Sequence, residues 1–151
     1  MRPLALALAV WCLSSLPRVA AGDVAAPGRI VVHADRIELR EPVYFDSAKA
    51  TLKPASHALL DEVAKALADH AELALVEIGV HSDERGADEY NLRITDERAA
   101  AIKSYLVAHG VAAARLRSRG YGETRPLCPE HNEACWSRNR RVELVAVKAA
   151  P

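Results

Sequence analysis

The chain has 151 residues, with 20 basic and 20 acidic side chains, and half of its residues are hydrophobic. This length and balance are typical of a single globular domain and exclude a disordered chain. A zero net charge argues against nucleic acid as a partner, because general nucleic-acid binders carry a basic excess. Beyond the first 20 residues, no apolar run is long enough to span a membrane.

The N-terminus has the pattern of a secretory signal peptide. Arg2 precedes an uncharged stretch rich in Leu and Ala, and small residues before position 22 predict cleavage after Ala21. Cleavage would remove two arginines and no acid, which leaves a slightly acidic mature chain. An uncleaved membrane anchor is the alternative, although the apolar run is short for a spanning helix. Cys12 does not fit a lipidation site, because the bulky Trp11 precedes it.

The segments after residue 21 alternate between strand-like and helix-like patterns. Residues 22–29 are rich in Gly, Pro and Ala and read as a linker. Residues 30–45 hold strand-like fragments, which predict a first strand or a small hairpin. Apolar residues recur every three or four positions over residues 54–70, which predicts a helix, and the short apolar run 73–80 predicts a buried strand.

The second half of the domain begins with a polar stretch, residues 81–94, that we interpret as a loop. Thr95 is the expected N-cap of a second helix, which Gly110 ends. A third strand is expected at 116–122, a loop at 127–138 and a last strand at 142–147. The predicted order is β-α-β-α-β-β, an α/β sandwich of two layers whose two β-α-β crossings predict adjacent strands.

Asp83 and Arg98 are the residues best placed for chemistry. Asp83 follows a buried strand, and Arg98 falls in the first turn of the predicted second helix, where ligands of open α/β sheets bind. A guanidinium can hold a carboxylate while a carboxylate holds an ammonium, so the pair suits a zwitterionic ligand. From spacing alone, the favoured explanation is a salt bridge between the two, or an Asp83 that caps a turn, because surface ion pairs are common and mostly contribute little.

Four motifs favour the first explanation, in which Asp83 and Arg98 bind a zwitterionic ligand. In chain order they are His81-Ser82-Asp83, Asn91 through Ala99, Gly120 through Pro126, and Asn139 through Glu143. Together with Tyr44-Phe45-Asp46-Ser47 upstream, this pattern resembles the OmpA-like C-terminal (OmpA/Pal/MotB) family. One departure is Val80, which stands where the family has Gly and restricts the backbone there.

The resemblance implies an OmpA-like fold over residues 30–148, followed by a tail at 149–151, and non-covalent binding of peptidoglycan through the diaminopimelate of its stem peptide. It implies no enzyme activity and no cofactor or metal. Asp83 and Arg98 would clamp the diaminopimelate. The remaining implied ligand-binding residues are Asn91, Phe45, Asp46, Ser47 and Arg141. The expected location is the periplasm of a Gram-negative bacterium, in association with the outer membrane.

Two further features leave alternatives open. Cys128 and Cys135 predict a disulfide in an exported chain, and a metal site formed with His131 is the rival explanation, although it lacks a fourth ligand. The second feature is the distribution of the histidines, which are scattered along the chain. The sequence shows neither a nucleophile nor a metal-binding pair of the kind that a wall hydrolase would need. A periplasmic adaptor that docks another envelope protein remains the main alternative function.

Overall fold

The computed structural model describes residues 28–148, so the predicted signal peptide, its cleavage site and Cys12 lie outside the described residues. The domain contains five strands and three α-helices, with short 3₁₀ turns η1 (Pro54–Ser56) and η2 (Ala113–Arg115). The strands are β1 (Ile30–Val32), β2 (Arg36–Leu39), β3 (Val76–His81), β4 (Leu116–Gly122) and β5 (Arg141–Ala146). The helices are α1 (His57–Asp69), α2 (Asp88–Ala108) and α3 (Glu133–Asn139).

The strands form one mixed sheet in the order β1-β2-β5-β3-β4, in which only β3 and β4 are parallel. The predicted α/β sandwich is confirmed. The expectation of two crossings between adjacent strands is wrong for the first crossing, because β5 lies between β2 and β3 and pairs with both. Strand periodicity predicts that a segment is a strand but not which strand it pairs with. The sequence pattern therefore could not predict that β5 lies between β2 and β3.

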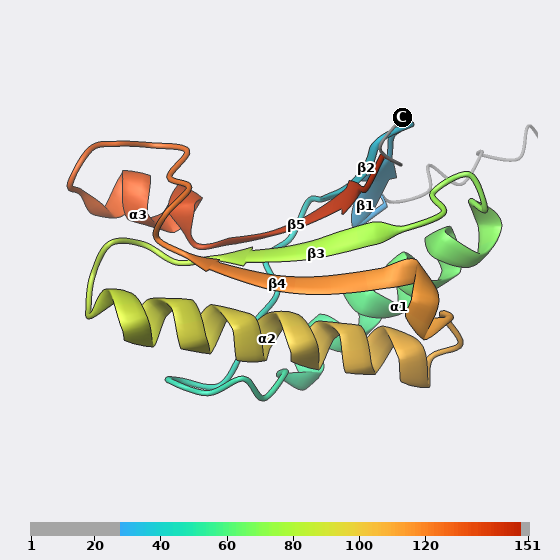
Figure 1. Ribbon diagram of the computed structural model, residues 1–151, viewed down its shortest axis with the longest axis horizontal. Coiled ribbons are helices and arrows are strands. Elements are labelled where there is room, and N and C mark those ends of the chain that lie inside the picture. Colours follow the sequence, from blue (N-terminus) through green and yellow to red (C-terminus); the bar gives the residue numbers. More distant parts are fainter. Residues whose placement is uncertain (1–27, 149–151) are drawn as a thin grey trace, which may run out of the picture.

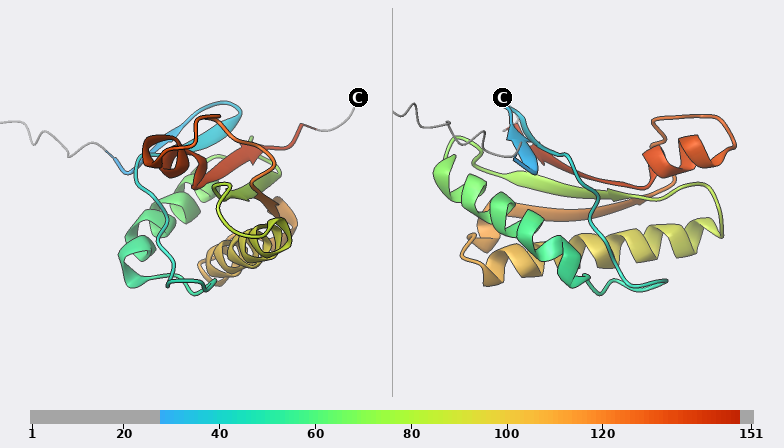
Figure 2. Two further views of the ribbon diagram at one scale, coloured as in Figure 1. Left: turned by 90° about the vertical axis from the view of Figure 1, so that its left-hand side faces the viewer. Right: turned by 180° about the vertical axis from the view of Figure 1, so that it is seen from behind.

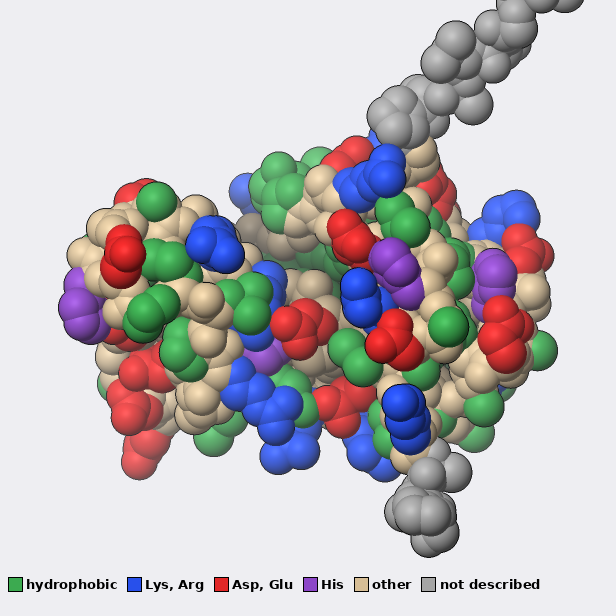
Figure 3. Space-filling model, turned by 90° about the horizontal axis from the view of Figure 1, so that it is seen from above, with side chains coloured by type: hydrophobic (Ala, Val, Ile, Leu, Met, Phe, Trp, Pro, Cys, Tyr) green, Lys and Arg blue, Asp and Glu red, His purple; other side chains and the backbone are tan. Residues whose placement is uncertain are grey.

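Helices α1 and α2 cover one face of the sheet, and α3 lies at one end of it (Figures 1 and 2). The predicted apolar stripe of α1 is buried, and it packs against Ile78 of β3 and Leu144 of β5 in the main core. The opposite face of the sheet carries charged side chains of both signs (Figure 3). The alternation of inward apolar and outward polar residues along the strands explains this two-layer arrangement.

Helix α2 begins eight residues earlier than the sequence predicts, since its N-cap is Ala87 and not Thr95. Gly86, with a positive φ of 106°, precedes it, and Asp88 and Glu89 occupy its first turn. Thr95 is therefore an interior residue and not an N-cap. Its buried hydroxyl donates to the carbonyl of Asn91 at 2.7 Å and accepts from the backbone N–H of Gly122 at 2.9 Å. Thr95 thus joins α2 to β4, a tertiary role that mimics the chemistry of a cap.

The Gly-Tyr-Gly segment at the end of β4 passes directly over α2. A Cβ atom at Gly120 would lie 2.2 Å from the backbone nitrogen of Asp96, so only glycine permits this approach. The contact fixes the height of β4 above the helix. The small hairpin expected within residues 30–45 is confirmed as β1 and β2, whereas Phe45 forms only an isolated bridge with Leu52. The predicted loop at 127–138 contains α3, which is a correction.

Candidate functional site

A cavity of about 630 Å³ opens where the segment that connects β2 to α1 passes the ends of β3 and β5. The right-hand view of Figure 2 shows this connecting segment running alongside the sheet and down to α2. Four guanidinium groups line the cavity, against a single carboxylate, that of Glu41. The lining residues are Leu39 through Phe45, Val80, His81, Arg98, Ser137, Arg140, Arg141 and Val142.

Arg98 presents a guanidinium that has no acidic partner among residues 28–148. It projects from the middle of α2, and not from a first turn, and it lies over the ring of Phe45 at 4.9 Å. Its Nε donates to the carbonyl of Lys49 at 3.0 Å, which fixes its direction. The group is half-buried, and this burial lowers the pKa of Arg98. A desolvated, oriented cation of this kind is suited to a bidentate carboxylate.

Asp83 is buried, with 6% of its surface exposed, and its carboxylate is fully paired. Arg85 donates to it from its backbone N–H at 3.0 Å and from Nε and Nη2 at 3.2 and 2.8 Å. Arg140 donates from Nη1 at 2.6 Å. Burial alone raises the pKa of Asp83, but the hydrogen bonds from Arg85 and Arg140 outweigh it and lower the pKa to about 2.

The structure therefore brings Arg98 to the cavity and keeps Asp83 behind it. The two residues do not form the salt bridge that spacing allowed, since Asp83 pairs with Arg85 and Arg140. The backbone bond from Arg85 closes a turn at Asp83, so the turn-capping explanation is correct for one of its oxygens. Arg140 is the group that contacts both Asp83 and the cavity.

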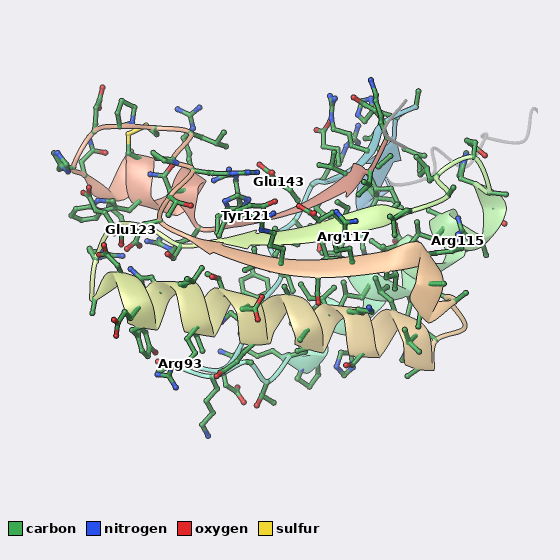
Figure 4. The ribbon with its side chains drawn as sticks, in the orientation of Figure 1. Arg93, Arg115, Arg117, Tyr121, Glu123 and Glu143 are labelled. Atoms are coloured by element: carbon green, nitrogen blue, oxygen red, sulfur yellow. A yellow bond between two sulfur atoms is a disulfide. The ribbon has the colours of Figure 1, made fainter. Side chains whose placement is uncertain are left out.

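Asn91 holds the loop that carries Asp83. Its side-chain amide donates to the carbonyls of Asp83 and Arg85 and, at 2.8 Å, to Glu123 of the segment after β4 (Figure 4). This amide is buried and faces the loop backbone. Through these contacts Asn91 orders the loop, while its predicted contact with a ligand stays a prediction.

The other implied residues differ in their positions. Phe45 lines the cavity beneath Arg98, whereas Asp46 and Ser47 lie in the turn after it, outside the cavity wall. Arg141 lines the cavity, but all three of its nitrogens are engaged: Nε donates to Glu143 at 2.7 Å, and the others to backbone carbonyls. These bonds join the start of β5 to the segment after β4.

His81 closes the floor of the cavity with a ring that is buried and stacked on Tyr121, 4.9 Å between centroids. Its Nε2 lies 3.4 Å from Oε2 of Glu143, which Figure 4 shows on β5. His81 and Arg141 together lower the pKa of Glu143 to about 2, against the opposing effect of its burial. Val80 next to it is a buried strand residue without positive φ, so its side chain imposes no backbone strain.

Sequence reasoning missed Arg85, Arg140 and Trp136, the aromatic residue that supports Arg85. The Arg85 guanidinium lies over the ring of Trp136 on α3 at 4.4 Å, and the indole N–H donates to Glu84 at 2.8 Å. In the Asn-Arg-Arg motif, the predicted site residue was the second arginine, Arg141. The first arginine, Arg140, is the one that reaches Asp83. The only sequence signal was that Arg140 directly precedes a strand beside the Asp83 loop.

The predicted disulfide between Cys128 and Cys135 is present and closes the segment before α3. The rival metal site has no support, since His131 contacts Glu84 and no cluster of three metal-ligating side chains occurs within residues 28–148. Asn132 caps α3 by accepting the backbone N–H of Cys135 at 3.0 Å. Residues 28–148 also contain no helix long and apolar enough to cross a membrane.

The domain is a two-layer α/β structure with a cationic cavity at the ends of two strands, an architecture that OmpA-like domains share. Residues 44–140 match the OmpA family, and the chain belongs to this family. The family is non-enzymatic, which confirms the expectation that the domain is not an enzyme.

Relatives and solved structures agree with this assignment. The chain is 42% identical over 101 residues to the peptidoglycan-associated lipoprotein of Pseudomonas aeruginosa, covering 67% of this chain and 59% of that protein. It superposes on the peptidoglycan-associated lipoprotein of Burkholderia pseudomallei with a TM-score of 0.60 at 36% identity, covering 68% and 86% of the two chains. A cell wall anchor of the type VI secretion system from P. aeruginosa gives 0.63 at 28% identity, covering 78% and 87%. The chain spans about three-fifths of the length of the first curated relatives that it matches.

Proposed function

We propose that the protein binds peptidoglycan non-covalently in the cell envelope of a Gram-negative bacterium, after export to the periplasm. The observation that carries the proposal is Arg98, a half-buried cation that faces a cavity of about 630 Å³ and has no acidic partner among the residues that the structure describes. Membership of the OmpA family and the likeness to peptidoglycan-associated lipoproteins support it.

The proposed ligand group is the diaminopimelate of the stem peptide. Its side-chain end carries both a carboxylate and an ammonium, whereas the lysine of other stem peptides carries the ammonium alone. Arg98 would hold the carboxylate through its planar fork, and Asp83 would hold the ammonium. Phe45 lines the wall beside the carboxylate, with Asp46 and Ser47 in the adjoining turn, while Asn91 keeps the Asp83 loop in place and Arg141 supports the wall from β5.

The test is co-sedimentation of the full chain with purified sacculi that contain diaminopimelate. Arg98→Ala and Asp83→Ala should stay in solution, and Arg93→Ala should sediment like the wild type. Arg93 is a matched control because it is an exposed arginine of the same helix that does not line the cavity (Figure 4).

Sacculi with lysine in place of diaminopimelate separate the coarse proposal from the fine one. Equal sedimentation on both would contradict recognition of diaminopimelate while leaving wall binding intact. Failure of a folded wild type on either wall would move the adaptor function to first place, and release of soluble fragments would indicate a hydrolase.

A further inference from the structure

The carboxylate of Asp83 has no room for a ligand in this structure. A carboxylate offers about four acceptor positions, two on each oxygen. Oδ1 accepts from the backbone N–H and the Nε of Arg85, and Oδ2 accepts from Nη2 of Arg85 and Nη1 of Arg140. All four positions are filled, so an ammonium can bind Asp83 only by displacing one of these donors.

Arg140 is the donor that stands between Asp83 and the cavity. Its side chain lines the cavity, whereas Asp83 does not. The side chain of Asp83 is only 7% exposed, compared with 41% for that of Arg140. A ligand that enters from the cavity therefore meets the Arg140 guanidinium before it meets the carboxylate.

Arg140 is also the donor that costs least to displace. Arg85 is attached to Asp83 by three hydrogen bonds and is stacked on Trp136. Arg140 is attached by one, and its Nη2 already donates to Glu133 on α3. When Nη1 leaves Asp83, the guanidinium keeps an ion pair with Glu133, so its charge is not left unpaired.

We propose that Arg140 is a gate on Asp83. In the free protein it covers the carboxylate, and when a ligand ammonium arrives it leaves Asp83 and stays paired with Glu133. This inference rests on the proposed function and adds the residue that controls the same site. A ligand with an ammonium but no carboxylate for Arg98 gains too little to open the gate. The gate therefore makes the domain selective for a group that presents both charges.

The experiment compares two soluble muropeptides by calorimetry on the full chain. One carries diaminopimelate with its free side-chain amine, and the other carries the same residue with that amine acetylated. Arg140→Met removes the gate and keeps the apolar stem. It should bind the free-amine muropeptide on the order of 10-fold more tightly, the factor expected when the open state is populated about one-tenth of the time. The acetylated muropeptide should gain nothing.

Arg40→Met is the matched control, because Arg40 lines the same cavity but does not contact Asp83. It should change the binding of both muropeptides by the same factor. Glu133→Gln is a second variant at an exposed position of α3. It should weaken binding of the free-amine muropeptide, since Arg140 then has no charged acceptor apart from Asp83.

The outcomes separate the gate from the proposed function. If the wild type binds, Asp83→Ala does not, and Arg140→Met binds equally or more weakly, the gate is wrong and the proposed function stands. An equal gain for both muropeptides also overturns it, since that result reports only the loss of a positive charge. If no variant binds either muropeptide, the proposed function and the gate fall together. A gain confined to the free amine supports the gate.

Discussion

Arg98 and Asp83 are the two charges of the proposed clamp, and the free protein keeps them in opposite states. Arg98 faces the cavity, has no acidic partner within the described part of the chain, and is fixed by one backbone carbonyl and one aromatic ring. Asp83 is buried behind the wall and holds four hydrogen bonds. One charge is open to the cavity, while the other is paired within the folded protein.

The contrast teaches how one site can combine stability with binding. A buried carboxylate without partners would destabilise the loop, so the fold supplies internal cations. The half-buried guanidinium of Arg98 needs no such partner, because part of it stays in contact with water. The following expectations test this division, which predicts that Arg98 contributes to binding alone and that Asp83 contributes to both.

Arg98→Ala gives the largest expected effect. It should lose about 2–5 kcal/mol of binding free energy, the range for removing one partner of a buried charge pair. Its free energy of unfolding should change by less than about 1 kcal/mol, since no ion pair is lost. Calorimetry with a diaminopimelate muropeptide and urea unfolding measure the two quantities. A large loss of stability would contradict the division of roles.

The pH dependence of stability should report Asp83. Its folded pKa of about 2 lies below the value of an unfolded aspartate, so its contribution is present above pH 4 and is lost as the pH falls through about 2. The full contribution is about 2.5 kcal/mol. Glu143 acts in the same direction.

Urea unfolding at pH 6 and pH 2.5 isolates the share of Asp83. The difference between the two pH values should be about 2 kcal/mol smaller in Asp83→Asn than in the wild type. Identical differences would show that the carboxylate is not paired in solution.

Removal of the disulfide should weaken the structure around the Asp83 loop and not that around Arg98. The double variant Cys128→Ser, Cys135→Ser should lose about 2.5 kcal/mol of stability, from the entropy of an eight-residue loop. Because α3 carries Trp136 and Glu133, weaker support should loosen the Asp83 loop before Arg98. Hydrogen exchange would measure the order, and faster exchange first around Lys49 and Arg98 would contradict it.

The smallest expected effect comes from Trp136→Phe. It keeps an aromatic ring under Arg85 but loses the hydrogen bond to Glu84, a cost of about 1 kcal/mol. Thermal unfolding measures this cost. No change in stability would mean that the indole N–H is equally well satisfied by water.

The sequence was sufficient for the fold class and for most elements. Regular apolar spacing identified α1. The Gly-rich motif located the end of β4, and the Asn-Arg-Arg motif located the start of β5. The start of α2 was missed because the polar residues 81–94 contain no apolar stripe, and the helix there is stabilised by contacts with β4 and the Asp83 loop. Such tertiary contacts do not appear in a local pattern.

For the site, motifs identified the residues but not their partners. Asp83 and Arg98 were predicted as ligand-binding charges near one end of the sheet, and that role stays a prediction. Nothing in their spacing showed that Asp83 would pair with Arg85 and Arg140. Arg140 lies 57 positions from Asp83 in the chain. Its contact depends on the insertion of β5 into the sheet, which the sequence pattern did not predict.

The stacking of Arg85 on Trp136 places a natural optical probe at this site. The sequence has two tryptophans, and removal of the predicted signal peptide would leave Trp136 alone. Its indole touches the cation that holds Asp83 and bonds the neighbouring Glu84. Any rearrangement of that loop should therefore change the emission of the ring, and the protein could report its own occupancy without a label.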